Sequence, residues 1–147
     1  MRKRSHRKPR ELINPLTHVL SGLVPVRSNP NYMLRTSIAM HNAYEALRTG
    51  KASRDEFDGL RDNLNVTQAL AQRIGHGIEY LTEINAAHDA MRSIKARGIK
   101  ATGPELMAVL RAVEIHDAQL QIATVVEVEK AWAYVCSQVA SQTARKV

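Results

Sequence analysis

Residues 102–143 read TGPELMAVLRAVEIHDAQLQIATVVEVEKAWAYVCSQVASQT, and this stretch decides the fold class. Aliphatic side chains recur in it at steps of three and four residues, which is the period of a helix with one buried face. They are Leu106, Val109, Leu110, Val113, Leu120, Ala123, Val128, Ala131, Val135 and Val139. No Gly or Pro follows Pro104. We therefore predict a single C-terminal helix of about forty residues, well above the mean helix length of globular proteins.

The same period continues upstream in three shorter segments that end at glycines. The segments cover residues 31–50, 53–75 and 78–98. Gly is typical of helix ends because it adopts the left-handed conformation there at no steric cost. Residues 12–20 predict one further short helix. The chain is therefore expected to be all-α, an up-down bundle of about four main helices with a long C-terminal helix and a short N-terminal helix.

Two of the expected helices begin with a capping box, in which a Ser or Thr and a Glu three residues later satisfy each other's backbone donors. Ser53 with Glu56 and Thr102 with Glu105 have this spacing. Each pair stands directly before an aliphatic run, so we expect a helix to begin immediately after Ser53 and after Thr102.

The composition suits helices packed on helices. Hydrophobic residues make up 44% of the chain but aromatics only 4%, so the core must be aliphatic. A sheet would use more β-branched and aromatic residues. Cys136 is the single cysteine, which excludes an internal disulfide and a cysteine metal cluster. No run approaches the roughly 18 apolar residues of a membrane helix, so we expect no membrane contact. The length of 147 residues is that of one domain, and we expect a single helical domain over residues 12–147.

Positive charge is concentrated at the N-terminal end. Residues 1–44 contain eight Lys or Arg and one Glu, for a net charge of +7, while residues 45–147 contain thirteen charges of each sign. Residues 1–11 form a basic arm that cannot bury itself. Its cations are Arg2, Lys3, Arg4, Arg7, Lys8 and Arg10. Such a cluster attracts phosphates without reading sequence, so DNA or RNA is the leading target; an acidic protein groove and a role in solubility are the alternatives.

Two histidines in the expected helices, His88 and His116, directly precede an aspartate. His116 and Asp117 interrupt the apolar stripe between Val113 and Leu120, so at least one of them is expected to point inward. The favoured role is a buried polar network that holds the helix register. The alternative is a metal site at His88, His116 and Asp117, although the Glu-x-x-His step of helical di-metal sites is absent. We predict no metal, no cofactor and no catalytic residue.

Residues 67–84, TQALAQRIGHGIEYLTEI, also permit an interpretation as a helix-turn-helix. Ala71 and Gly75 have the four-residue spacing of that motif. The second helix, however, carries Glu79 and Glu83, and carboxylates facing a phosphate-lined groove would be repelled. Two amphipathic helices joined by a Gly-rich turn are therefore the favoured interpretation.

The C-terminal end of the long helix is the candidate surface for a protein partner. Apolar side chains occur on several faces of VVEVEKAWAYV (125–135), which favours contact on more than one side. The candidate interface residues are Val128, Trp132, Tyr134 and Val135. Trp132 suits a core position and an interface anchor equally well. We expect a homo-oligomer or a complex with another protein.

Four segments carry a resemblance to known proteins. They are MRKRSHRKPR (1–10), LVPV (23–26), TGPEL (102–106) and EIHDAQLQIATVVEVEKA (114–131). Together they resemble a group of small proteins encoded in phage and prophage genomes of proteobacteria, which implies a task in the bacterial cytoplasm during infection or lysogeny. The resemblance carries no functional residues with it.

Two hypotheses about function follow. The first is a non-catalytic accessory protein that associates with nucleic acid through its basic arm. The alternative is a protein-interaction module that docks through the C-terminal helix, either on a host factor that it inhibits or as an oligomeric assembly component built with phage proteins.

Overall fold

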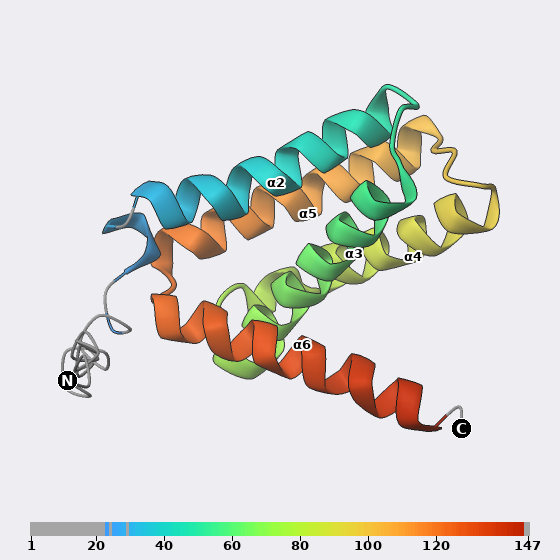
Figure 1. Cartoon of the computed structure of the whole chain (residues 1–147). Coiled ribbons are helices and arrows are strands. Elements are labelled where there is room, and N and C mark those ends of the chain that lie inside the picture. The colour runs from blue at the N-terminus through green and yellow to red at the C-terminus, as the bar shows by residue number, and fades with distance from the viewer. Residues whose placement is uncertain (1–22, 24, 29, 146–147) are drawn as a thin grey trace, which may run out of the picture.

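The computed structural model describes residues 23, 25–28 and 30–145. The basic arm and the expected helix at residues 12–20 lie outside these residues. Within them, α-helices are joined by short turns (Figure 1). The elements are η1 (Val26–Ser28), α2 (Pro30–Arg48), α3 (Arg54–Ala69), η2 (Leu70–Ile74), η3 (Ile78–Tyr80), α4 (Leu81–Ala96), α5 (Gly103–Ile122) and α6 (Val125–Arg145). The prediction of an all-α fold is confirmed.

Helices α2 to α5 run in alternating directions, with α2 beside α5 and α3 beside α4 (Figure 1). Their inward faces share one largely aliphatic core. Its buried side chains include Met40, Phe57, Leu60, Leu64, Met91 and Ile94. Burial of each such side chain stabilises the folded state by about 1.5–3 kcal/mol. This packing stabilises the helices, because an isolated short helix is only marginally stable in water.

The turn between α3 and α4 depends on two glycines. Residues Leu70–Ile74 widen into a single π-helical turn, and the N–H groups of Gly75 and His76 both donate to the carbonyl of Leu70 at 3.0 Å. Gly75 and Gly77 have φ angles of +96° and +84°, in the left-handed region that residues with a Cβ avoid. The chain reverses here, and α4 runs back along α3 (Figure 1).

Both predicted capping pairs begin helices. Before α3, the N–H of Glu56 donates to the Ser53 hydroxyl at 3.1 Å, and the N–H of Ser53 donates to the Glu56 carboxylate at 3.2 Å. Before α5, the Glu105 carboxylate accepts from the backbone N–H and the hydroxyl of Thr102, at 2.9 and 2.8 Å. Hydrogen bonds from Arg97 and then from Thr102 lower the pKa of Glu105 to about 2.

The prediction of one C-terminal helix of about forty residues is wrong. The helix is broken at Ala123 and Thr124, because Ala123 adopts an extended conformation with φ −75° and ψ 152°. The carbonyl of Ala123 accepts the N–H of Val26 at 2.9 Å, beside an antiparallel bridge between Pro25 and Thr124. The N-terminal connector thus bonds to a carbonyl that a continuous helix would have used internally.

A third capping pair opens α6. The N–H and the hydroxyl of Thr124 donate to Oε1 of Glu127 at 2.9 and 3.1 Å, and the N–H of Glu127 donates to the Thr124 hydroxyl at 3.3 Å. Burial raises the pKa of Glu127, but hydrogen bonds from Thr124 and His76 outweigh burial and lower it. TVVE (124–127) has the spacing of the two pairs identified from the sequence, so the break had a local signal.

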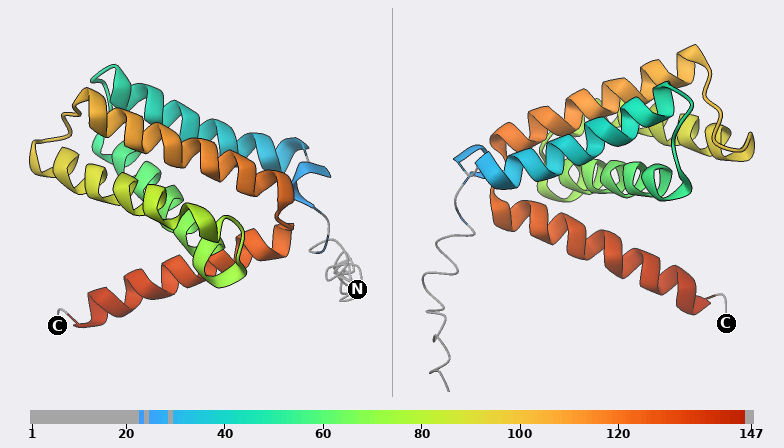
Figure 2. Two further views of the ribbon diagram at one scale, coloured as in Figure 1. Left: turned by 180° about the vertical axis from the view of Figure 1, so that it is seen from behind. Right: turned by 45° about the horizontal axis from the view of Figure 1, so that its top comes forward.

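Helix α6 packs across the C-terminal end of α3 rather than joining the four alternating helices. Its buried face forms a second core with α3, the π-helical turn, the end of α5 and the N-terminal connector. The buried members are Val26, Val66, Ala69, Leu70, Leu120, Ala123, Val128, Ala131 and Val135. Beyond this contact α6 diverges from the other helices (Figure 2). Residues 136–141 are all exposed.

Candidate functional site

The basic arm predicted to bind nucleic acid lies outside the residues that the structure describes. Its predicted site residues are Arg2, Lys3, Arg4, Arg7, Lys8 and Arg10. Their role stays a prediction.

The predicted partner interface on α6 is partly turned inward. Val128 and Val135 belong to the core that α6 shares with α3, and only 1% and 7% of their surfaces are exposed. Trp132 and Tyr134 are partly buried against the same core. The spacing from Val128 through Ala131 to Val135 places these side chains on the face that meets α3. The structure therefore corrects the prediction for the two valines, which are not available to another chain.

His116 lies at the centre of a buried polar network, as the interrupted stripe predicts. The Thr67 hydroxyl is 2.9 Å from the carbonyl oxygen of Asn63 and 2.9 Å from Nδ1 of His116. A carbonyl only accepts, so Thr67 donates its proton to Asn63 and accepts the N–H at Nδ1 of His116. Burial lowers the pKa of His116 to about 4, so the ring is neutral. Gln119 donates to the carbonyls of Thr67 and His76, at 2.9 Å each, and ties α5 to α3 and its turn.

The three candidate metal ligands occupy different environments. Asp117 faces α2, where its carboxylate accepts from the Ser37 hydroxyl at 3.0 Å and lies 2.6 Å from Nε2 of His41. His88 stands on α4, where burial lowers its pKa and a hydrogen bond joins it to the backbone of Leu64. In the described part of the chain, no three His, Cys, Asp or Glu side chains gather as a metal ion would require. These contacts fit a role in holding the helix register.

Residues 67–84 contain the end of α3, the hairpin turn and the start of α4. Helix α4 begins only at Leu81, after the 3-10 turn of Ile78–Tyr80, and runs back beside α3 (Figure 1). Glu79 is exposed on this turn, and Glu83 is partly buried on α4. Acidic groups thus stand where a helix-turn-helix would present its recognition surface, which favours the interpretation as two packed helices.

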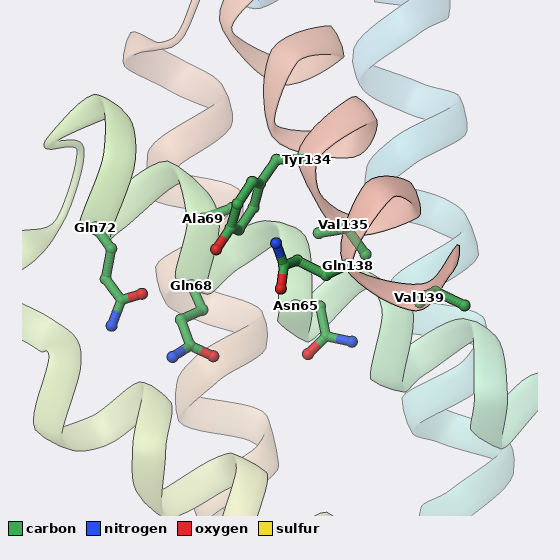
Figure 3. Close-up of a pocket in the computed structure, with 8 residues that line it drawn as sticks. All are labelled: Asn65, Gln68, Ala69, Gln72, Tyr134, Val135, Gln138 and Val139. Carbon is green, nitrogen blue, oxygen red and sulfur yellow. The ribbon is translucent and has the colours of Figure 1, made fainter. Parts of the chain in front are cut away.

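A polar pocket of about 230 Å³ lies between α3 and α6 (Figure 3). Four carboxamides line it, from Asn65, Gln68 and Gln72 of α3 and from Gln138 of α6. Figure 3 shows Tyr134 and Gln138 extending from α6 toward α3. None of the four carboxamides hydrogen-bonds to another described residue. The pocket therefore presents donors and acceptors from two helices that no described residue engages.

Two further hollows, each lined by cations, share lining residues with the pocket. At one end it shares Tyr134 with a hollow beside Arg73 and Lys130, and the Arg73 guanidinium lies 3.9 Å from the centroid of the Tyr134 ring. At the other end it shares Asn65 and Val139 with a hollow of about 510 Å³ that α3, α4 and α6 line. The ionisable side chains of that hollow are Arg61, Asp62, His88, Arg92 and Lys95. We call the three hollows together the α3–α6 groove.

Positive charge exceeds negative charge in this groove. Five cations line it, against a single carboxylate, that of Asp62. Arg61 is paired with Asp58 and Asp62, and Arg92 is paired with Asp89. The remaining cations, which have no carboxylate partner among the described residues, are Arg73, Lys95 and Lys130. A polyanion is therefore a better electrostatic match to the groove than a polycation.

The central pocket offers recognition rather than proton transfer. Its only titratable side chain is the phenol of Tyr134, and carboxamides do not exchange charge at neutral pH. The nearest imidazole in the groove is His88, whose pKa is lowered by burial. Each carboxamide, by contrast, both donates and accepts hydrogen bonds. The pocket is suited to an uncharged ligand group with several polar atoms along its edge.

The sequence analysis did not predict this pocket, although the polar residues that line it recur at helical spacing on each of the two helices. Asn65, Gln68 and Gln72 recur at steps of three and four residues, which places them on one face of α3. Tyr134 and Gln138 are four residues apart on α6. A polar stripe of this kind is also typical of a solvated helix face. Spacing alone therefore does not reveal that the two stripes face each other.

No family model, curated protein or solved structure matches this chain. None of the helices in the described part of the chain is long and apolar enough to cross a membrane. The function must accordingly be inferred from the chain's own residues.

Proposed function

We propose that this protein is a non-catalytic accessory protein that associates with nucleic acid through its basic N-terminal arm, in the bacterial cytoplasm during phage infection or lysogeny. The observation that carries the proposal is the segregation of charge. Residues 1–44 hold the whole net charge of +7, whereas the charges of residues 45–147 cancel. Six of the eight cations fall within residues 1–10, close enough together to contact neighbouring phosphates.

Counterion release sets the expected behaviour. Each phosphate that a Lys or Arg neutralises frees a condensed counterion, so the affinity falls as the salt concentration rises. For about six phosphate contacts, affinity for duplex DNA should fall about 10³-fold between about 50 and 200 mM salt. The arm contains no aromatic residue, so stacking on bases does not add to this attraction.

The test compares the full-length protein with a full-length variant whose arm cations are all replaced by Gln, namely Arg2, Lys3, Arg4, Arg7, Lys8 and Arg10. Binding to mixed-sequence DNA and RNA is followed by fluorescence anisotropy across a salt series. The matched control replaces Lys51 and Lys100, two exposed lysines outside the groove, by Gln. We expect a steep salt dependence in the wild type and the control and its loss in the arm variant. Unchanged binding by the arm variant, or no binding by the wild type at low salt, would refute the proposal.

A second function, as a protein-interaction module, is favoured by the C-terminal end of α6. Residues 136–141 are all exposed, and 52% of the surface of Val139 is accessible. A helix end of this kind can dock on a second copy, on a host protein or on a phage protein. Light scattering should then detect an oligomer that Val139→Asp dissociates, while Met107→Asp, at an exposed position on α5, leaves it intact. A monomer that captures no protein from nuclease-treated host lysate would count against this function.

A further inference from the structure

We propose that the α3–α6 groove binds a single strand of nucleic acid, with a nucleobase in the carboxamide pocket and phosphates against the cations at its two ends. The inference rests on the proposed function and deepens it, because it gives the folded domain a contact that the arm cannot make. The arm attracts phosphates wherever they are, whereas the groove holds hydrogen-bonding groups at fixed positions.

The carboxamides favour a nucleobase as the central ligand group. Each of the four carboxamides presents one acceptor oxygen and two N–H donors. With one donor and one acceptor, an Asn or Gln side chain makes two hydrogen bonds at once to the edge of an adenine. None of the four carboxamides has a hydrogen-bond partner among the described residues, so no contact within this part of the chain has to be broken when a ligand binds. No charged side chain lines this pocket of about 230 Å³. It therefore suits a neutral heterocycle better than a phosphate or a carboxylate.

The cations favour phosphates on either side of that base. Arg73 and Lys130 lie beyond Tyr134 at one end, and Lys95 lies beyond Asn65 at the other. Five cations line the groove. Three carboxylates, those of Asp58, Asp62 and Asp89, pair with its arginines, so the net charge is +2.

The length of the groove suits a short stretch of one strand. Arg61 and Arg73 stand near its two ends and are twelve residues apart in the sequence, about 18 Å at 1.5 Å per helical residue. About five nucleotides span this distance at about 3.4 Å each.

The concave shape selects a single strand over a duplex. A base inside a duplex is paired and stacked, so a pocket between two helices can reach its edge only after the base has been splayed out. Side chains that read duplex DNA instead project from a helix into the major groove. Here carboxamides of α3 and α6 line one pocket between the two helices, and a duplex would leave them unused (Figure 3).

The experiment separates recognition of bases from recognition of charge. The full-length protein is titrated into a labelled mixed-sequence DNA strand of about twelve nucleotides, within the usual site size of such proteins. The reference is an abasic strand of the same length and charge. Because both strands meet the arm equally, the ratio of their affinities reports the groove. We expect the base-containing strand to bind at least about fivefold more tightly than the abasic strand, because one good carboxamide–base contact changes the affinity by at least this factor.

The test variant combines Gln72→Ala and Gln138→Ala, two exposed positions whose replacement leaves the cores intact. Gln121→Ala is the matched control, because Gln121 is an exposed amide on α5 outside the groove. The test variant should bind both strands with equal affinity, while the control keeps the preference for bases. A second variant, Lys95→Gln with Lys130→Gln, should weaken both strands by a similar factor and leave their ratio unchanged.

Three results would overturn the inference. The first is equal binding of the two strands by the wild type, and the second is a full base preference in the variant Gln72→Ala with Gln138→Ala. The third is binding of a polyglutamate peptide that the same variant abolishes, which would identify an acidic peptide as the occupant. Failure of the proposed function looks different, because the variant without arm cations would then bind both strands as tightly as the wild type, or the wild type would bind neither strand at low salt.

Discussion

Acid should destabilise this protein through His116. His116 lies on α5 with only 1% of its surface exposed, and its Nδ1–H donates to the Thr67 hydroxyl. Its Nε2 has no hydrogen-bond partner in the described structure and is shielded from solvent. Protonation would place a positive charge at this buried nitrogen, so the folded state keeps the ring neutral and lowers its pKa from 6.5 to about 4. The unfolded chain, whose imidazole is solvated, takes up the proton more readily.

The size of the effect follows from the difference between the two pKa values. Above about pH 6.5 both states hold a neutral ring, and the stability is fully present. As the pH falls from 6.5 toward 4, only the unfolded state binds the proton, and stability is lost. Between about pH 7.5 and pH 5 the linkage lowers the free energy of unfolding by about 2 kcal/mol.

Urea denaturation of wild type and His116→Gln at these two pH values measures the effect. Because Gln does not titrate, the difference between the two pH values should be about 2 kcal/mol smaller in His116→Gln than in the wild type. Gln119→Met is the matched control, since it disturbs the same network without removing a titrating group. It should lower the stability at both pH values by a similar amount. An equal pH dependence in wild type and His116→Gln would refute the reasoning, as would an NMR titration of the native ring near pH 6.5.

Two further predictions concern helix ends and interiors. Gly59→Ala should raise the free energy of unfolding by about 0.5–1 kcal/mol, because Gly59 lies inside α3 and nothing stands within 4 Å of the added Cβ. Gly75→Ala should lower it by about 1 kcal/mol, since φ is +96° there, and thermal denaturation of the pair checks the opposite signs. Thr124→Ala should cost about 1 kcal/mol by removing the cap that bonds Glu127, whereas Thr82→Ala, an exposed residue on α4, should change stability by less than about 0.5 kcal/mol. Equal urea midpoints for the two threonine variants would contradict the role of the cap.

In a complex with nucleic acid, the arm and the groove would contribute differently to the affinity. Cations in the arm raise the association rate and the affinity for any phosphate chain, and their effect fades as salt is added. Carboxamides in the groove carry no charge, so their contribution should persist at higher salt. Base preference measured across a salt series is therefore expected to stay constant while the overall affinity falls.

Much of the fold could be predicted because its signals are local. The aliphatic period, the boxes at Ser53 and Thr102 and the left-handed Gly75 act within a few residues along the chain, and each lies where the sequence predicts. The same period predicted that at least one of His116 and Asp117 points inward, and His116 does. The break at Thr124 had a local signal too, in the Glu that stands three residues later. The absence of Gly and Pro after Pro104 nevertheless favoured one unbroken helix over a break at Thr124.

The sequence by itself determined the all-α class, the starts of α3 and α5 and the confinement of excess charge to the N-terminal end. Only the tertiary structure decided that the N–H of Val26 bonds the carbonyl of Ala123 and that Val128 and Val135 face α3. It alone brought Gln72 and Gln138 to one pocket. The physical reason is that periodicity reports which face of a helix is apolar or polar. Which two faces meet depends on how segments far apart in the chain pack together to bury apolar surface.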